Sequence, residues 1–172
     1  AEADVLRLSL GNAATATLEA LPGRRFPGTV VEIGASALPP VGTQAAARVM
    51  AAAGGGSITH IASIEGSQPA YGHAHYAVSK AAVIMHARAA AIEYGPRGVR
   101  VNTVSPGLIA REGIEETWPS GVTRWLAAAP LGRMGRGSDV ADACVFLASP
   151  MASFITGHDL VVDGGVSAHP TW

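Results

Sequence analysis

A hydroxyl, a phenol and an ammonium lie close together in the middle of this 172-residue sequence. They belong to Ser63, Tyr76 and Lys80. If the chain is helical from about His75, Tyr76 and Lys80 are four residues apart and project from the same face of the helix. Their head groups can then share one small site. Tyr71 precedes the expected helix start and lies off that face, so it is the weaker partner.

A phenol beside an ammonium is suited to moving protons. A free tyrosine has a pKa near 10, too high for a good base at neutral pH, but a nearby ammonium stabilises its phenolate form. Lys80 is the only lysine in the chain, beside eleven arginines. Arginine would fill a fork-shaped volume, whereas lysine presents a compact point charge. A chain that otherwise uses arginine for positive charge uses an ammonium here.

Composition sets the broad class of the protein. The chain is 48% hydrophobic with a formal net charge of −1, which suits one globular domain over residues 1–172 and offers no basic field for nucleic acid. It lacks an apolar run of membrane-spanning length and a signal pattern, and its single Cys144 cannot form an internal disulfide. We therefore expect a cytoplasmic protein with no membrane partner. His73 and His75 lack a third ligand, so no metal site is expected.

The hydrophobic pattern predicts strands that alternate with helices. Strands are expected at 5–10, 57–62, 99–104 and 160–162, and helices at 41–53, about 75–94 and 138–148. Gly11–Ala14 would end the first strand, and the Pro- and Gly-rich stretch to Pro40 should hold short helical pieces and loops. Gly95 and Pro96 should end the second helix with a left-handed cap. Ser138 should cap the third.

This order of elements indicates an α/β fold, a Rossmann-like parallel sheet with helices on both faces. Ligands of such sheets bind beyond the carboxyl ends of the strands, where Asn12, Ser63 and Gly107 are all expected. Residues 108–134 show no clean period and are interpreted as a substrate lid that carries Trp118 and Trp125. An equally good reading is that both tryptophans only pack over the core.

The Ser63, Tyr76 and Lys80 spacing resembles the Ser…Tyr-x-x-x-Lys signature of the short-chain dehydrogenase/reductase family. Flanking segments agree in order: residues 56–63 resemble the strand that leads to that family's catalytic serine, and residues 98–107 its next strand and Pro-Gly turn. Residues 130–136 and 155–165 resemble its C-terminal quarter. The resemblance is strong from about residue 41 to residue 165. Within the family, the sequence most resembles the 3-oxoacyl-carrier-protein reductase type.

The resemblance implies an NAD(P)-dependent oxidoreductase that interconverts a carbonyl and an alcohol of a small molecule. Tyr76 would be the acid/base, Lys80 would favour its phenolate and bind the ribose, and Ser63 would orient the substrate oxygen. The cofactor would be NAD or NADP. The resemblance places the cofactor contacts at Asn12, Ala13, Ala62, Tyr76, Lys80, Pro106, Gly107 and Ile109. It also implies a homo-oligomer, a dimer or tetramer, formed through the helix 75–94 and the last strand.

Three features depart from the family pattern. The glycine-rich strand and turn that hold the pyrophosphate are not found, so we expect a fold truncated at the N-terminus, without the family's first three strands. Gly34 aligns with the family's catalytic asparagine, and Arg111 with a threonine that often binds the carboxamide. These departures leave open a shortened enzyme, an enzyme that takes its dinucleotide half from another chain, and a non-catalytic remnant kept for assembly. Cofactor-free lyase or dehalogenase chemistry is disfavoured, because such relatives tend to replace the lysine with arginine.

Overall fold

A parallel sheet of three strands forms the centre of the protein in this computed structural model, which describes residues 13–17, 25–29 and 41–168. The strands are β3 (Gly56–Ile61), β4 (Val99–Pro106) and β5 (Asp159–Val162), hydrogen-bonded in the order β3-β4-β5. Both pairs are parallel, with Gly56 opposite Val99 and Val104 opposite Leu160. β4 is therefore the central strand, and its three valines are fully buried.

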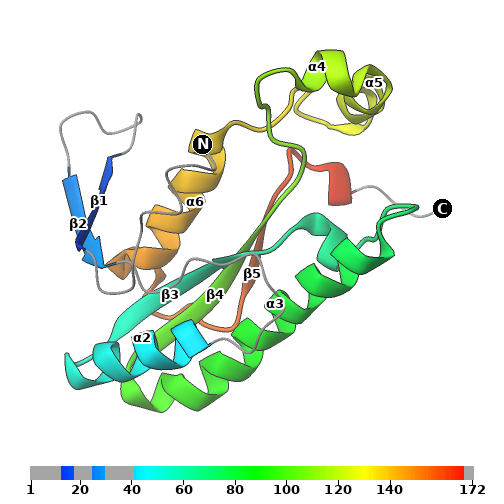
Figure 1. The fold of residues 1–172 in the computed structure, drawn as a ribbon. Helices are drawn as coiled ribbons and strands as arrows, with labels where there is room; N and C mark the ends of the chain where they lie inside the picture. The colour runs from blue at the N-terminus through cyan, green and yellow to red at the C-terminus, as the bar shows by residue number, and fades with distance from the viewer. Residues whose placement is uncertain (1–12, 18–24, 30–40, 169–172) are drawn as a thin grey trace.

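Helices cover both faces of this sheet (Figure 1). α2 (Val41–Ala52) and α3 (Ala74–Tyr94) pack on one face, and α6 (Gly137–Ala148) packs on the other. This confirms the predicted Rossmann-like arrangement, with element bounds within a residue or two of those expected. Short 3₁₀ turns connect the elements: η1 (Ile64–Gly66), η2 (Gly95–Arg97), η3 (Pro150–Ala152) and η4 (Val166–Ala168).

The two faces are packed with side chains of different size. Under α2 and α3 the core is largely alanine, which lets both helices approach the sheet closely. Its buried members are Ala46, Ala47, Ile58, Ala87, Ala90, Ala91, Tyr94, Val99 and Val101. Under α6, Val104, Leu147 and Ala152 are buried, and partly buried side chains such as Phe146 and Leu160 pack against them. The long α3 helix is therefore held tightly against the sheet.

Two predicted helix ends are corrected by the structure. Gly95 is right-handed (φ −52°) and α3 continues into η2, so the left-handed residue is Gly98 (φ 76°). The N-cap of α6 is Arg136 rather than Ser138. The Asp139 carboxylate accepts the Arg136 N–H at 2.6 Å, and this bond starts the helix two residues earlier than an N-cap at Ser138 would.

The prediction for residues 11–40 is wrong where the structure describes them. β1 (Ala13–Thr17) and β2 (Arg25–Thr29) form a separate antiparallel pair, with Ala13 opposite Thr29. Residues 13 and 14 were expected to end a strand, but the segment Ala13–Thr17 is itself a strand. It contains two threonines, and β-branched residues favour extended backbone. The strand expected at 5–10, together with Asn12 and Gly34, lies outside the described residues.

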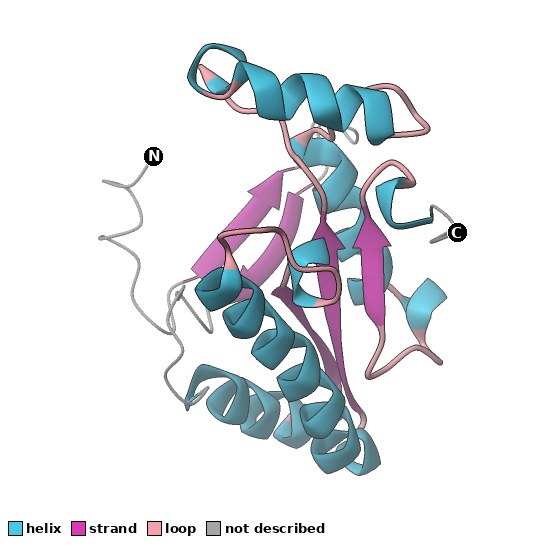
Figure 2. Cartoon of the chain, turned by 90° about the vertical axis from the view of Figure 1, so that its right-hand side faces the viewer, coloured by secondary structure: helices cyan, strands magenta, loops and turns pink. Residues whose placement is uncertain are grey.

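Two helices follow β4 and lie across the ends to which the strands point, as Figure 2 shows. They are α4 (Ile114–Thr117) and α5 (Pro119–Ala128). Both fall within residues 108–134, the segment interpreted as a lid. None of the helices in the described residues is long and apolar enough to span a membrane.

Candidate active site

The site begins at the carboxyl end of β3. The Ala62 N–H donates to the Val104 carbonyl at 2.8 Å, which continues the sheet pairing past the strand. Ser63 follows and is buried, with 8% of its surface exposed. Its Oγ accepts the N–H of Glu65 at 3.2 Å. Because a hydroxyl has one proton and two lone pairs, the Ser63 O–H remains available to donate to a ligand oxygen.

The first turns of α3 bring the phenol and the ammonium together. The Lys80 Nζ lies 5.6 Å from the centroid of the Tyr76 ring and donates to the main-chain carbonyl of Ile61 at 3.1 Å. Ile61 is the last residue of β3, so this bond joins the helix to the strand that ends before Ser63. Tyr76 is 38% exposed, and its hydroxyl has no hydrogen-bond partner among the described residues. The structure thus places Lys80 beside Tyr76 and ties Lys80 to the strand that leads to Ser63.

The turn η1 is pressed against the same part of α3. A Cβ at Gly66 would lie 2.9 Å from the Lys80 carbonyl carbon, 3.0 Å from the Ala81 nitrogen and 2.8 Å from Ile84 Cδ1. Any side chain at position 66 would therefore push η1 away from the helix. A second link runs from Glu65 to His73, the N-cap of α3, whose Nδ1 lies 3.0 Å from Glu65 Oε2. From the sequence, His73 was considered only as a metal ligand and Glu65 was assigned no role, so this contact was not predicted.

The end of β4 forms the neighbouring wall. The Gly107 N–H donates to the Val162 carbonyl at 3.0 Å, which holds the Pro106–Gly107 turn beside the end of β5. The Trp125 indole of α5 lies on this turn, because a Cβ at Gly107 would be only 2.3 Å from its Cη2. The Trp125 Nε1 is buried and has no acceptor among the described residues.

Asp163 shapes the loop after β5. Its Oδ1 accepts the Gly165 N–H at 2.9 Å and its Oδ2 accepts the Ser167 N–H at 2.7 Å. Burial opposes ionisation of this carboxyl, but the hydrogen bonds from Ser167 and Gly165 outweigh it, and the pKa of Asp163 is lowered. The ionised carboxylate therefore stabilises a loop that packs, at Gly165, against Pro130 in the segment that follows α5.

The other residues predicted for the site lie partly near the end of β4 and partly elsewhere in the fold. Ile109, two residues after Gly107, forms an isolated β-bridge with Gly135. Trp118 packs on Gly121 within the lid segment and is 44% exposed. Ala13 belongs to β1, which makes no sheet pairing with β3, β4 or β5. Asn12 lies outside the described residues, so its predicted cofactor contact stays a prediction.

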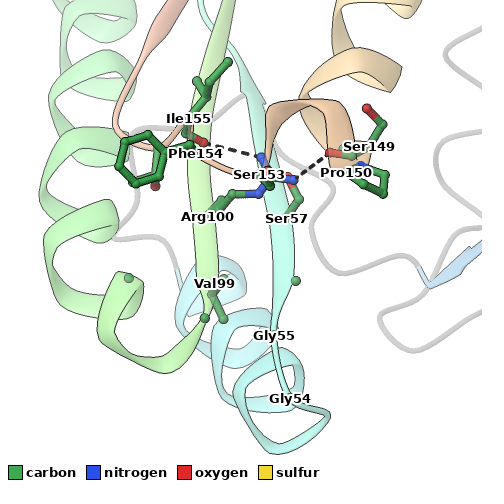
Figure 3. Close-up of a pocket in the computed structure, with 15 residues that line it drawn as sticks. Gly54, Gly55, Ser57, Val99, Arg100, Ser149, Pro150, Ser153, Phe154 and Ile155 are labelled. Atoms are coloured by element: carbon green, nitrogen blue, oxygen red, sulfur yellow. Dashed lines mark hydrogen bonds between the residues drawn. The ribbon is translucent and has the colours of Figure 1, made fainter.

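A cavity of about 700 Å³ lies at the opposite end of the sheet (Figure 3). It is lined by the first residues of β3 and β4 and by residues 148–150 and 153–156. Arg100 is its only titratable side chain, and its guanidinium donates to the carbonyls of Leu147, Ser149 and Ile155 at 2.7–3.4 Å. These bonds tie β4 to the segment after α6, so we assign this cavity a structural role. No cluster of three metal-ligating side chains occurs among the described residues.

Comparisons with known proteins place this geometry in context. A family model described as Enoyl-(Acyl carrier protein) reductase matches residues 29–167. The chain is 40% identical over 127 residues to 2,5-dichloro-2,5-cyclohexadiene-1,4-diol dehydrogenase of Sphingobium indicum, covering 74% of this chain and 51% of that protein. It is 38% identical over 120 residues to 3-oxoacyl-(acyl-carrier-protein) reductase of Chlamydia trachomatis, covering 70% and 48%.

A solved structure of a dehydrogenase is also similar to this chain. The structure of 7α-hydroxysteroid dehydrogenase complexed with NADH and 7-oxo glycochenodeoxycholic acid superposes with a TM-score of 0.69 and 34% identity. The match covers 72% of this chain and 49% of that one. The chain spans about half the length of the curated relatives it matches.

Proposed function

Because the chain belongs to the short-chain dehydrogenase/reductase family, we propose that it takes part in NAD(P)-dependent interconversion of a carbonyl and an alcohol. The observation that carries this proposal is the position of the Lys80 ammonium. Its bond to the Ile61 carbonyl holds the charge 5.6 Å from the Tyr76 ring, at the end of the strand that leads to Ser63. A proton donor, a charge that favours its ionised form and an orienting hydroxyl then share one site.

The described residues suit the ribose and nicotinamide end of a dinucleotide. One of the three Lys80 N–H groups is used by Ile61, which leaves two for hydroxyl acceptors such as those of a ribose. The relative solved with NADH supports the choice of a nicotinamide cofactor. Pro106 and Gly107 supply the proposed wall at the neighbouring strand end. When bound, the nicotinamide supplies or accepts the hydride.

The chain's own residues would then handle the proton and the substrate oxygen. In the reducing direction, Ser63 donates its O–H to the carbonyl oxygen, because its Oγ already accepts from Glu65. Tyr76 transfers its phenolic proton to the same oxygen, so the carbonyl gains one hydride and one proton and becomes the alcohol. The Lys80 ammonium stabilises the phenolate that remains. In the oxidising direction the phenolate takes the proton back.

Cofactor binding and turnover test this proposal. Titration of the purified chain with NADH and with NADPH should give a saturable change in nicotinamide fluorescence. Tyr76→Phe should retain this binding and lose about 10²- to 10⁴-fold in turnover, the usual contribution of a positioned acid. Tyr71→Phe is the matched control, because Tyr71 is fully exposed and lies before α3. Absence of binding of either dinucleotide at millimolar concentration would refute autonomous activity of this chain.

A non-catalytic assembly role is the second candidate, and one observation favours it. An apolar stripe runs along the exposed side of α3 at spacings of four and three residues. It consists of Val78, Ala82, Met85, Ala89 and Ile92, and Val78, Met85 and Ile92 are 70%, 59% and 80% exposed. Val49 of the neighbouring α2 is 70% exposed as well. Such a surface on a water-facing helix is typical of an interface.

We infer that this stripe pairs with the same stripe of a second copy, since a heptad-like seam is self-complementary. Size-exclusion chromatography with light scattering should show a defined oligomer for the unaltered chain and a smaller species for Met85→Glu. Leu131→Glu introduces the same charge at a leucine that is 67% exposed, away from α3, and should leave the size unchanged. A monomeric unaltered chain would count against both the stripe and the assembly role.

A further inference from the structure

The turn η1 connects the two parts of the proposed site. It starts directly after Ser63, and the chain reaches α3, which carries Tyr76 and Lys80, ten residues later. The placement of the Ser63 hydroxyl relative to Tyr76 therefore depends on how η1 is fixed to the first turn of α3. β3 itself fixes only the backbone up to Ala62, whose N–H still pairs with Val104.

Glu65 makes contacts in both directions. Its N–H donates to the Ser63 Oγ at 3.2 Å. Its carboxylate oxygens lie 3.0 and 3.2 Å from Nδ1 of His73. A carboxylate can only accept, so Nδ1 must carry the proton. One residue thus holds the serine hydroxyl with its main chain and the N-cap of α3 with its side chain.

The close packing of Gly66 makes this link effective. With no Cβ, Gly66 lets η1 rest directly on the α3 backbone at Lys80 and Ala81. That contact restrains η1 at the second turn of the helix, while the Glu65 carboxylate restrains it at the helix start. The Glu65 side chain is only 21% exposed, whereas that of His73 is 51% exposed. The carboxylate is consequently the better shielded partner of the pair.

We propose that Glu65 and His73 are positioning residues that clamp the Ser63 turn to the start of α3 and so set the separation of the Ser63 and Tyr76 hydroxyls. The proposal rests on the function proposed above for those two hydroxyls. The clamp acts on geometry alone and adds no chemical step. Its effect should appear mainly in kcat, because a misplaced orienting group reduces the stabilisation of the transition state more than it reduces substrate binding.

Amide hydrogen exchange tests the clamp independently of activity. The amides of Glu65, Ser67 and Ala77 report on it, because they donate to Ser63 Oγ, the Ile64 carbonyl and the His73 carbonyl. Exposed ion pairs contribute little, so Glu65→Ala and His73→Ala should each raise exchange at these amides about two- to fivefold. His73→Gln retains an N–H donor and should restore part of the protection. His75→Asn, at an exposed histidine one residue into α3 with no ion pair in the described part of the chain, should change nothing.

Steady-state kinetics provide the second readout. Glu65→Ala and His73→Ala should lower kcat about two- to tenfold with KM within about twofold, and the double variant should lose no more than the larger single loss. Unchanged exchange in both single variants would overturn the clamp, whether or not the chain turns over a substrate. Raised exchange with an unchanged kcat would overturn its role in positioning. Raised exchange in a chain without turnover would support the clamp and refute the proposed function instead.

Discussion

Replacing Gly107 with alanine should separate α5 from the strand ends. The backbone of Gly107 lies outside the left-handed region, so alanine meets no conformational penalty there and only the added methyl matters. That methyl would lie 2.3 Å from Cη2 and 2.7 Å from Cζ2 of Trp125, and 2.9 Å from Cβ of Asp163. Carbon atoms in contact prefer about 3.5–4.0 Å. The indole must therefore move by about 1 Å or more.

The cost follows from overpacking. Extra methyl groups in well-packed regions destabilise by about 1–3 kcal/mol. For a chain of this size, 1 kcal/mol corresponds to about 2–4 °C in Tm, so Gly107→Ala should lower Tm by roughly 2–12 °C. In a Trp125→Leu background the methyl gains room, and adding Gly107→Ala should cost almost nothing further. The coupling free energy of the two substitutions should thus be about 1–3 kcal/mol.

Thermal and urea unfolding followed by circular dichroism measure these differences. Gly137→Ala is the matched control, because a Cβ at Gly137 meets no atom within 4 Å and the residue begins α6. It should be neutral or slightly stabilising, since alanine is the better helix former. Equal stability of Gly107→Ala and Gly137→Ala, or additive losses in the Trp125→Leu background, would refute the packing of α5 on the turn.

Two further predictions concern polar side chains that stabilise the fold around the sheet. Asn102 is fully buried, donates to the Ile155 carbonyl at 3.0 Å and accepts the His158 N–H at 3.0 Å. Asn102→Ala leaves both partners without their hydrogen bond and should lower the free energy of unfolding, measured in urea, by about 2–5 kcal/mol. A loss below about 1 kcal/mol would contradict these bonds. The hydrogen bond from Arg133 lowers the pKa of Asp139 to about 2. Its stabilising effect should be complete above about pH 4 and lost as the pH falls through about 2; Asp139→Asn should remove this dependence, and identical acid unfolding of both proteins would contradict it.

The parallel sheet was predictable because its strands have local signals. The segment 99–106 contains three β-branched valines and a threonine, and Gly54–Gly56 and Gly95–Pro96 mark the ends of the helices that precede β3 and β4. Helix ends have weaker local signals. Residue preference favours Ser138 as the N-cap of α6, whereas the Asp139 carboxylate accepts the Arg136 amide and makes Arg136 the N-cap. The stretch from 11 to 40 carries proline and glycine, which suggested loops, yet residues 13–17 and 25–29 pair as strands.

The contacts of the proposed site also differ in how far the sequence predicts them. The helical spacing placed Tyr76 beside Lys80, because i and i+4 always share a face. The acceptor of the Lys80 ammonium, in contrast, depends on where α3 packs against β3. The Glu65 to His73 contact depends on the path of the loop between η1 and α3. Neither has a sequence signal. The predictions of a cytoplasmic protein and of the cofactor contacts remain predictions.

The bond from Lys80 to the Ile61 carbonyl has a consequence for how the chain can vary. Every amino acid carries the same main-chain carbonyl, so the side chain at position 61 contributes nothing to this acceptor, and it is 47% exposed. The position of the ammonium is therefore determined by the path of the strand and by the lysine, and not by the type of residue whose carbonyl accepts the hydrogen bond. A saturation library should accordingly tolerate most polar and apolar residues at 61 while accepting only lysine at 80.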